Sequence, residues 1–80
     1  MEEKAQGAYG KVRRGLYRHY KGNMYRVVGE ALHSETLEPM VVYRALYGER
    51  RLWVRPAAMF AGTVVVDGRE TPRFAYIGAK

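Results

Sequence analysis

The chain has 80 residues, of which 48% are hydrophobic and 12% aromatic, and its formal net charge is +6. A chain of this length has room for one hydrophobic core, and its apolar content is too high for a disordered polypeptide. It contains no cysteine, which excludes disulfides, thiolate nucleophiles and zinc sites built on cysteine.

The first residues form a polar segment with the period of neither a strand nor a helix. We therefore predict a flexible basic N-terminal arm over residues 1–14, followed by a single β-barrel domain over residues 15–77. Residues 9–26 hold six Lys or Arg, four tyrosines and no acid, while the rest of the chain is balanced in charge. Cations beside flat aromatic rings favour an anionic partner that can also stack, such as nucleic acid.

From Leu16 onward, β-branched and aromatic residues come in short runs separated by Gly, Asn, Pro and Asp, which is typical of strands. Residues 16–21 and 24–32 are predicted to form a hairpin. Gly22 and Asn23 join them and tolerate the positive φ of a tight turn. Alternation along the second strand predicts one buried side, made by Tyr25, Val27, Gly29 and Ala31.

The second half of the chain repeats this pattern after a polar loop that ends at Pro39. We expect strands over residues 40–47 and 51–55, and one helical turn over residues 56–61 that begins at Pro56. The Asp67-Gly68 turn predicts a last hairpin of residues 63–66 and 71–77.

The predicted fold class is all-β: a small SH3-like barrel of five or six short strands with one short helical turn. Closure removes the exposed edges that a short sheet would otherwise present. An oligonucleotide-binding barrel is the second choice, because that fold usually has a longer helix than residues 56–61 supply.

Six short blocks carry a resemblance to a known family. They are Gly15–Gly22, Tyr25–Val28, His33–Thr36, Val41–Arg44, Trp53–Pro56 and Pro72–Phe74. Over about residues 15–77 the sequence resembles the bacterial domain-of-unknown-function family numbered sixteen fifty-three. The resemblance implies a small stand-alone or appended module, and it implies no particular activity, cofactor or substrate.

The leading hypothesis is a non-catalytic binding module with an aromatic and arginine face. Its partner would be nucleic acid, a nucleotide-like anionic ligand or an acidic peptide, since rings stack on bases and arginine pairs with phosphate or carboxylate. Two or three of Tyr17, Tyr20, Tyr43, Tyr47 and Trp53 would line an open groove, although core packing is the commoner role for each tyrosine. The candidate ligand-binding residues are Tyr17, Arg18, His19, Tyr20, His33, Glu35, Tyr43, Arg44, Trp53 and Arg55.

Two alternatives belong to other classes of protein. The first is a protein-interaction or homo-oligomerising module that uses the apolar strand Met40–Tyr47. The second is a small enzyme in which His33 acts as a general base beside Glu35. A polar turn that caps backbone N–H groups is the simpler interpretation of the His33–Thr36 segment.

No cofactor and no metal is predicted. His19 and His33 have no third ligand type clustered near them, and no phosphate-binding glycine motif occurs. The apolar stretches are much shorter than the roughly 18 residues of a membrane helix, so we expect no membrane partner. The expected location is the cytoplasm.

Overall fold

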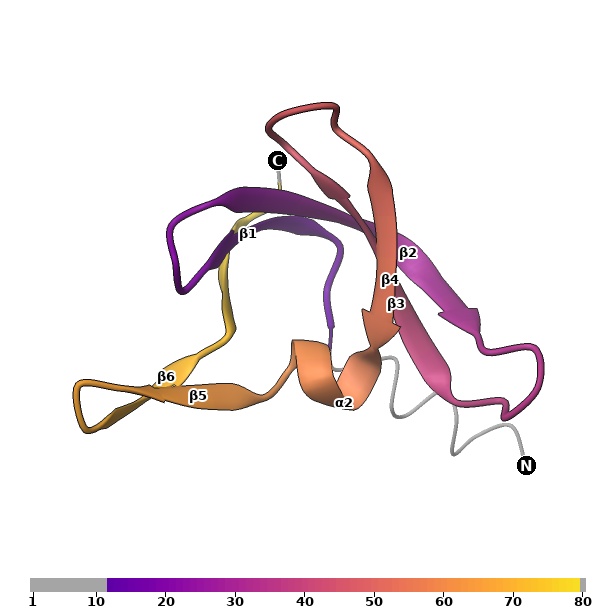
Figure 1. Cartoon of the computed structure of the whole chain (residues 1–80). Helices are drawn as coiled ribbons and strands as arrows, with labels where there is room; N and C mark the ends of the chain where they lie inside the picture. The colour runs from indigo at the N-terminus through magenta and orange to yellow at the C-terminus, as the bar shows by residue number, and fades with distance from the viewer. Residues whose placement is uncertain (1–11, 80) are drawn as a thin grey trace.

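The computed structural model describes residues 12–79, and its elements confirm the predicted all-β class with one short helix (Figure 1). The helix is α2 (Ala57–Phe60). The strands are β1 (Gly15–His19), β2 (Met24–Leu32), β3 (Pro39–Ala45), β4 (Leu52–Pro56), β5 (Thr63–Val66), β6 (Arg69–Pro72) and β7 (Phe74–Gly78). Within the described part of the chain, no helix is long and apolar enough to cross a membrane.

The strands form two antiparallel sheets rather than a closed barrel, so the predicted closure is wrong. The larger sheet has the order β4-β3-β2-β1-β7, and its two edges are β4 and β7. Among the described strands, β5 and β6 pair only with each other, and they project from the larger sheet as a separate hairpin (Figure 1). The sheet curves around its inner face, and α2 packs against β3 and β4.

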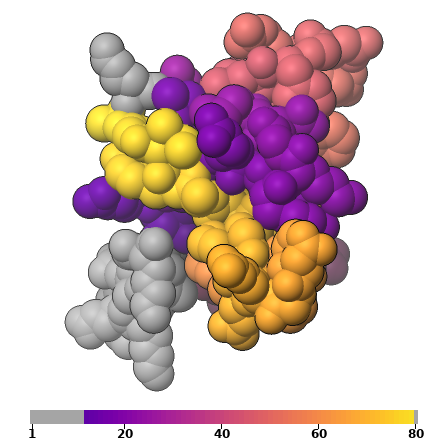
Figure 2. All heavy atoms as spheres, turned by 90° about the vertical axis from the view of Figure 1, so that its left-hand side faces the viewer, coloured from indigo at the N-terminus to yellow at the C-terminus, as the bar shows by residue number. Residues whose placement is uncertain are grey.

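A break at Arg73 accounts for this departure from the prediction. The sequence suggests one strand over residues 71–77, but the backbone N–H of Arg73 donates to Gly62 and its carbonyl accepts from Tyr20 N–H, both at 3.0 Å. These bonds lie outside the two ladders and turn the chain from one sheet into the other. β7 consequently pairs with β1, and Figure 2 shows the last residues, in yellow, against the first strand, in indigo.

A β-bulge changes which residues of β2 face inward. The register with β3 shifts between Val27 and Gly29, so that Gly29 lies opposite Val42 and Glu30 lies opposite Val41. Tyr25 and Val27 face the core as predicted, whereas Ala31 is exposed. The predicted single buried side of β2 is therefore wrong beyond Val27, because the extra residue reverses the alternation.

The core is built mostly from rings on the inner face of the large sheet. Phe60 of α2 stacks on Phe74 of β7 with a centroid separation of 4.0 Å and an interplanar angle of 4°. Tyr17, Tyr43 and Tyr25 meet these two rings edge to face. Val27 and Val41 fill the space beneath them and are almost completely buried.

Part of the predicted arm packs against the domain. Val12 is buried in the core cluster, and the hydroxyl of Tyr17 donates to the carbonyl oxygen of Arg13 at 2.7 Å. The rest of the predicted arm, residues 1–11, lies outside the described residues.

Candidate functional site

Rings and one arginine surround a pocket at the β4 edge of the inner face. Tyr43 lies opposite Trp53 in the β3–β4 ladder, so both side chains are on the same side of the sheet. The pocket has a volume of about 210 Å³ and is lined by Tyr25, Tyr43, Tyr47, Trp53 and Arg55. We call it the Trp53 pocket. Trp53 is 53% exposed and Tyr47 is 44% exposed, so two of its rings are accessible to a ligand.

Arg55 is held in place from two sides. Its Nε donates to the hydroxyl oxygen of Tyr43 at 3.2 Å, and its guanidinium carbon lies 5.7 Å from the centre of the Phe74 ring. Among the described residues, no carboxylate forms an ion pair with Arg55. The terminal N–H groups of Arg55 can therefore meet an anion without displacing a protein carboxylate.

Two tyrosine hydroxyls close one side of the Trp53 pocket. The hydroxyls of Tyr25 and Tyr47 share a hydrogen bond, and their rings meet edge to face at 5.5 Å. Burial, followed by this hydrogen bond, raises the pKa of Tyr25 to about 12. The Tyr25 hydroxyl thus stays neutral and adds no negative charge to the pocket.

His19 lies next to this cluster in a positively charged environment. Its ring packs 4.9 Å from Phe74 and 6.2 Å from Tyr25, and its Nδ1 accepts a hydrogen bond from the backbone N–H of Lys21. Burial lowers the pKa of His19, and the charges of Lys21, Arg55 and Arg73 lower it further. These charges make the inner end of the site attractive to anions.

A second hollow adjoins the Trp53 pocket and shares Tyr47 and Trp53 with it. Its volume is about 220 Å³, and it runs under the β3–β4 turn, where Arg50 and Arg51 lie. Arg51 pairs with Glu49 at 3.3 Å in a largely exposed contact, which contributes little to stability. Among the described residues Arg50 forms no ion pair, so a cation lies at this end of the exposed Tyr47 and Trp53 rings as well as at the Arg55 end.

Only some of the predicted site residues meet at this pocket. Tyr43, Trp53 and Arg55 line it, and His19 lies close by. Tyr17 is buried, and Tyr20 is exposed with Lys21 above its ring and lines none of the pockets described here. Arg18 and Arg44 project from the outer face, since neighbouring residues in a strand point to opposite sides.

The His33–Glu35 segment lies away from the pocket. Leu32 pairs with Pro39 at one end of the β2–β3 hairpin, whereas Tyr25 pairs with Ala45 at the other end. The Nδ1 of His33 accepts from the backbone N–H groups of Glu35 and Thr36. The histidine thus acts as the cap of its own turn, and neither it nor Glu35 lines the pockets described here.

Besides the cations Lys21, Arg50 and Arg51, three residues near the site were not among the predicted ones. They are Tyr25, Phe74 and Arg73. Alternation along β2 places Tyr25 inward and could have indicated it, but only the β1–β7 pairing brings Phe74 and Arg73 close. Within residues 12–79, no group of three or more His, Asp or Glu side chains could hold a metal ion.

Comparisons with known proteins support the family resemblance. A family model described as "Protein of unknown function (DUF1653)" matches residues 15–76. A crystal structure of a protein belonging to DUF1653 from Bordetella bronchiseptica is 38% identical, with a TM-score of 0.81, and the match covers 90% of this chain and 95% of that one. None of the curated proteins compared with the chain matches it.

Proposed function

The chain belongs to the DUF1653 family of proteins of unknown function, and we propose that it is a non-catalytic module that binds single-stranded nucleic acid at the Trp53 pocket. The observation that carries this proposal is the exposure of Trp53 and Tyr47 beside an arginine that no described carboxylate neutralises. Stacking of one base on an aromatic side chain contributes about 1–3 kcal/mol, largely independent of sequence.

The positive charges around the pocket can bind the phosphate backbone of a nucleic acid while the rings stack on one of its bases. Arg55 lies at the pocket, Arg50 lies at the adjoining hollow beside the Arg51–Glu49 pair, and Lys21 and Arg73 lie near His19. Phosphates on either side of a stacked base would therefore meet cations. A cytoplasmic location, which we include in the proposal because the chain has no cysteine, would bring this site together with RNA.

Fluorescence of Trp53 provides a direct test, because it is the only tryptophan in the chain. The probes are octamers of uridylate and of adenylate, titrated at several salt concentrations, and UMP and AMP as single nucleotides. Three or four phosphate contacts give a log-log salt slope of about −2 to −3 for a single strand. Tight binding of the mononucleotides with little salt dependence would instead favour a nucleotide-like ligand, and flat titrations at low salt would rule out both.

The β4 strand offers a matched pair of variants. Leu52 and Trp53 are almost equally exposed, at 51% and 53%, but they point to opposite faces of the sheet. Trp53→Ala should weaken binding of a labelled octamer, followed by anisotropy, by about 1–3 kcal/mol. Leu52→Ala should leave binding unchanged. Equal weakening by the two substitutions would contradict the placement of the site.

A second candidate function, self-association, is supported by the free edge of β4. The apolar strand proposed for this role, residues 40–47, lies inside the sheet between β2 and β4, so its backbone is already paired. β4 is one of the two edges of the large sheet, and its outer face exposes Leu52 and Val54 without a charge between Arg51 and Arg55. Such an edge can pair with a second copy. Light scattering across concentration tests this, and Val54→Lys should abolish any dimer.

A further inference from the structure

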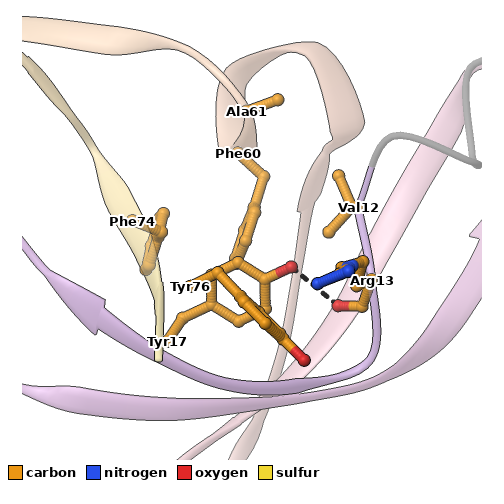
Figure 3. Close-up of a pocket in the computed structure, with 7 residues that line it drawn as sticks. All are labelled: Val12, Arg13, Tyr17, Phe60, Ala61, Phe74 and Tyr76. Carbon is orange, nitrogen blue, oxygen red and sulfur yellow. Dashed lines mark hydrogen bonds between the residues drawn. The ribbon is translucent and has the colours of Figure 1, made fainter. Parts of the chain in front are cut away.

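A second aromatic pocket shares no residue with the Trp53 pocket. Its volume is about 250 Å³, and we call it the Arg13 pocket. The rings of Tyr17, Phe60, Phe74 and Tyr76 line it, and Val12 and Arg13 come from the segment that precedes β1 (Figure 3).

The rings give this pocket the shape and chemistry of a site for one aromatic ring. The Tyr17 ring meets the Phe60 and Tyr76 rings edge to face, with centroid separations of 5.2 and 5.3 Å and interplanar angles of 80° and 67°. An apolar cavity of about 150 Å³ in another protein binds benzene. The larger Arg13 pocket can therefore hold a ring together with a small substituent.

Arg13 supplies the charge that defines the substituent. Its guanidinium carbon lies 4.6 Å from the centre of the Tyr76 ring, and its carbonyl oxygen accepts from the Tyr17 hydroxyl (Figure 3). Both ends of the residue are therefore held at the pocket. Among the described residues, no carboxylate forms an ion pair with Arg13. The N–H groups of its planar guanidinium can therefore donate to the carboxylate of a ligand.

We propose that the Arg13 pocket binds a small aromatic carboxylate, with the ring among the four aromatic side chains and the carboxylate on the Arg13 guanidinium. This site is independent of the nucleic-acid function proposed above, because the two pockets are lined by different residues. A neutral aromatic compound of the same size would keep the ring contacts and lose the ion pair.

Benzoate and benzamide are the matched probes, and binding is measured from backbone amide shifts in ¹H–¹⁵N spectra of the full chain. Benzoate should move the signals of Phe60, Ala61 and Tyr76, and its affinity should exceed that of benzamide about tenfold or more. Arg13→Gln should lower benzoate affinity by a similar factor and leave benzamide affinity unchanged. Equal affinity for the two compounds, or no binding of benzoate at tens of millimolar, overturns the proposal.

Two alanines near the end of α2 provide a steric control. Ala61 lines the Arg13 pocket, whereas Ala58 is exposed on the same turn and does not line it. Ala61→Leu should fill the pocket and abolish benzoate binding, while Ala58→Leu should bind as the wild type does. Spectra of the free variants show whether each is folded, and benzoate binding that survives in folded Ala61→Leu overturns the assignment of the pocket.

Discussion

The side chain of Arg55 in β4 donates from Nε to the Tyr43 hydroxyl in β3, across the ladder that joins the two strands. Tyr43 is buried and fixed by rings on several sides. Its hydroxyl therefore helps to fix the position of the Arg55 side chain, which also packs on the Phe74 ring. The consequence is a pre-positioned cation at the Trp53 pocket.

Removing that hydroxyl should loosen the arginine without disturbing the core. Tyr43→Phe keeps the ring, so we expect the fold to remain and single-stranded RNA to bind two- to tenfold more weakly, which corresponds to about 0.4–1.4 kcal/mol. Anisotropy of a labelled octamer measures the change. Arg55→Gln should cost at least as much, and a Tyr43→Phe variant with unchanged affinity would show that the hydrogen bond does not position Arg55 for the ligand.

The Tyr25–Tyr47 contact gives a spectroscopic prediction. Burial is the largest cause of the raised pKa of Tyr25, and the bond to Tyr47 is the next. Tyr47→Phe should therefore lower the Tyr25 pKa from about 12 but keep it above the ordinary value of about 10. Phenolate absorbance during an alkaline titration, compared with the wild type and with Tyr25→Phe, reports this shift. An unchanged titration would mean that the two hydroxyls do not interact in solution.

His19 should make stability depend on pH below neutrality. Burial and nearby cations lower its pKa in the folded state, so as pH falls through the ordinary value of about 6.5 the unfolded state takes up a proton first. This contribution to stability is fully present above about pH 6.5 and is lost toward the lower, folded-state pKa. Urea unfolding of the wild type and of His19→Gln at several pH values tests this. Between about pH 6.5 and the folded-state pKa of His19, the free energy of unfolding should fall less with decreasing pH in the variant than in the wild type. The same pH dependence in both proteins would contradict the prediction.

Adjacent residues of α2 should differ sharply in their effect on stability. Phe60 is 1% exposed and stacks on Phe74, whereas Met59 is 48% exposed. Phe60→Ala should lower the free energy of unfolding by about 3–5 kcal/mol, because it leaves a cavity in the ring cluster. Met59→Ala should cost less than about 1 kcal/mol. Denaturant unfolding compares the two, and similar losses would mean that the stack is not central to the core.

Gly15 should tolerate no side chain. Its φ is +134°, and a Cβ there would collide with the carbonyl oxygen of Gly78 in the neighbouring strand. Gly15→Ala should therefore destabilise the β1–β7 pair by about 2 kcal/mol or more. Gly29→Ala is the control, because nothing lies within 4 Å of its Cβ position. Amide exchange in β7 measures the effect, and equal protection in the two variants would contradict it.

Local signals in the sequence predict the elements better than their pairing. The strand over residues 24–32 and the short helix after Pro56 are confirmed, because each depends on neighbouring residues alone. The turn before that strand lies one to two residues earlier than predicted, since β1 ends at His19 and His19 N–H donates to the carbonyl oxygen of Asn23. The break at Arg73 depends on bonds to Gly62 and Tyr20, which are distant in the sequence. Pro72 beside it favours an edge or a strand start, but this signal does not predict a break, so a single strand was expected over residues 71–77.

The candidate site follows the same division. Adjacent residues of a strand point to opposite faces of the sheet. The sequence alone therefore indicates that Arg18 cannot share a site with Tyr17, nor Arg44 with Tyr43. The meeting of Trp53 and Arg55 with Tyr25 instead requires the register of β4, β3 and β2 together. That register includes the β-bulge between Val27 and Gly29, which cannot be predicted from the sequence of β2.

The pairing of β7 with β1 bears on when the protein can fold during synthesis. Phe74, half of the central stack, is translated after every other strand of the large sheet. A nascent chain emerging from the ribosome therefore lacks the ring on which Phe60 rests until the domain is almost fully made. Folding should be a late, concerted event that follows the emergence of β7, rather than a gradual growth of the sheet strand by strand.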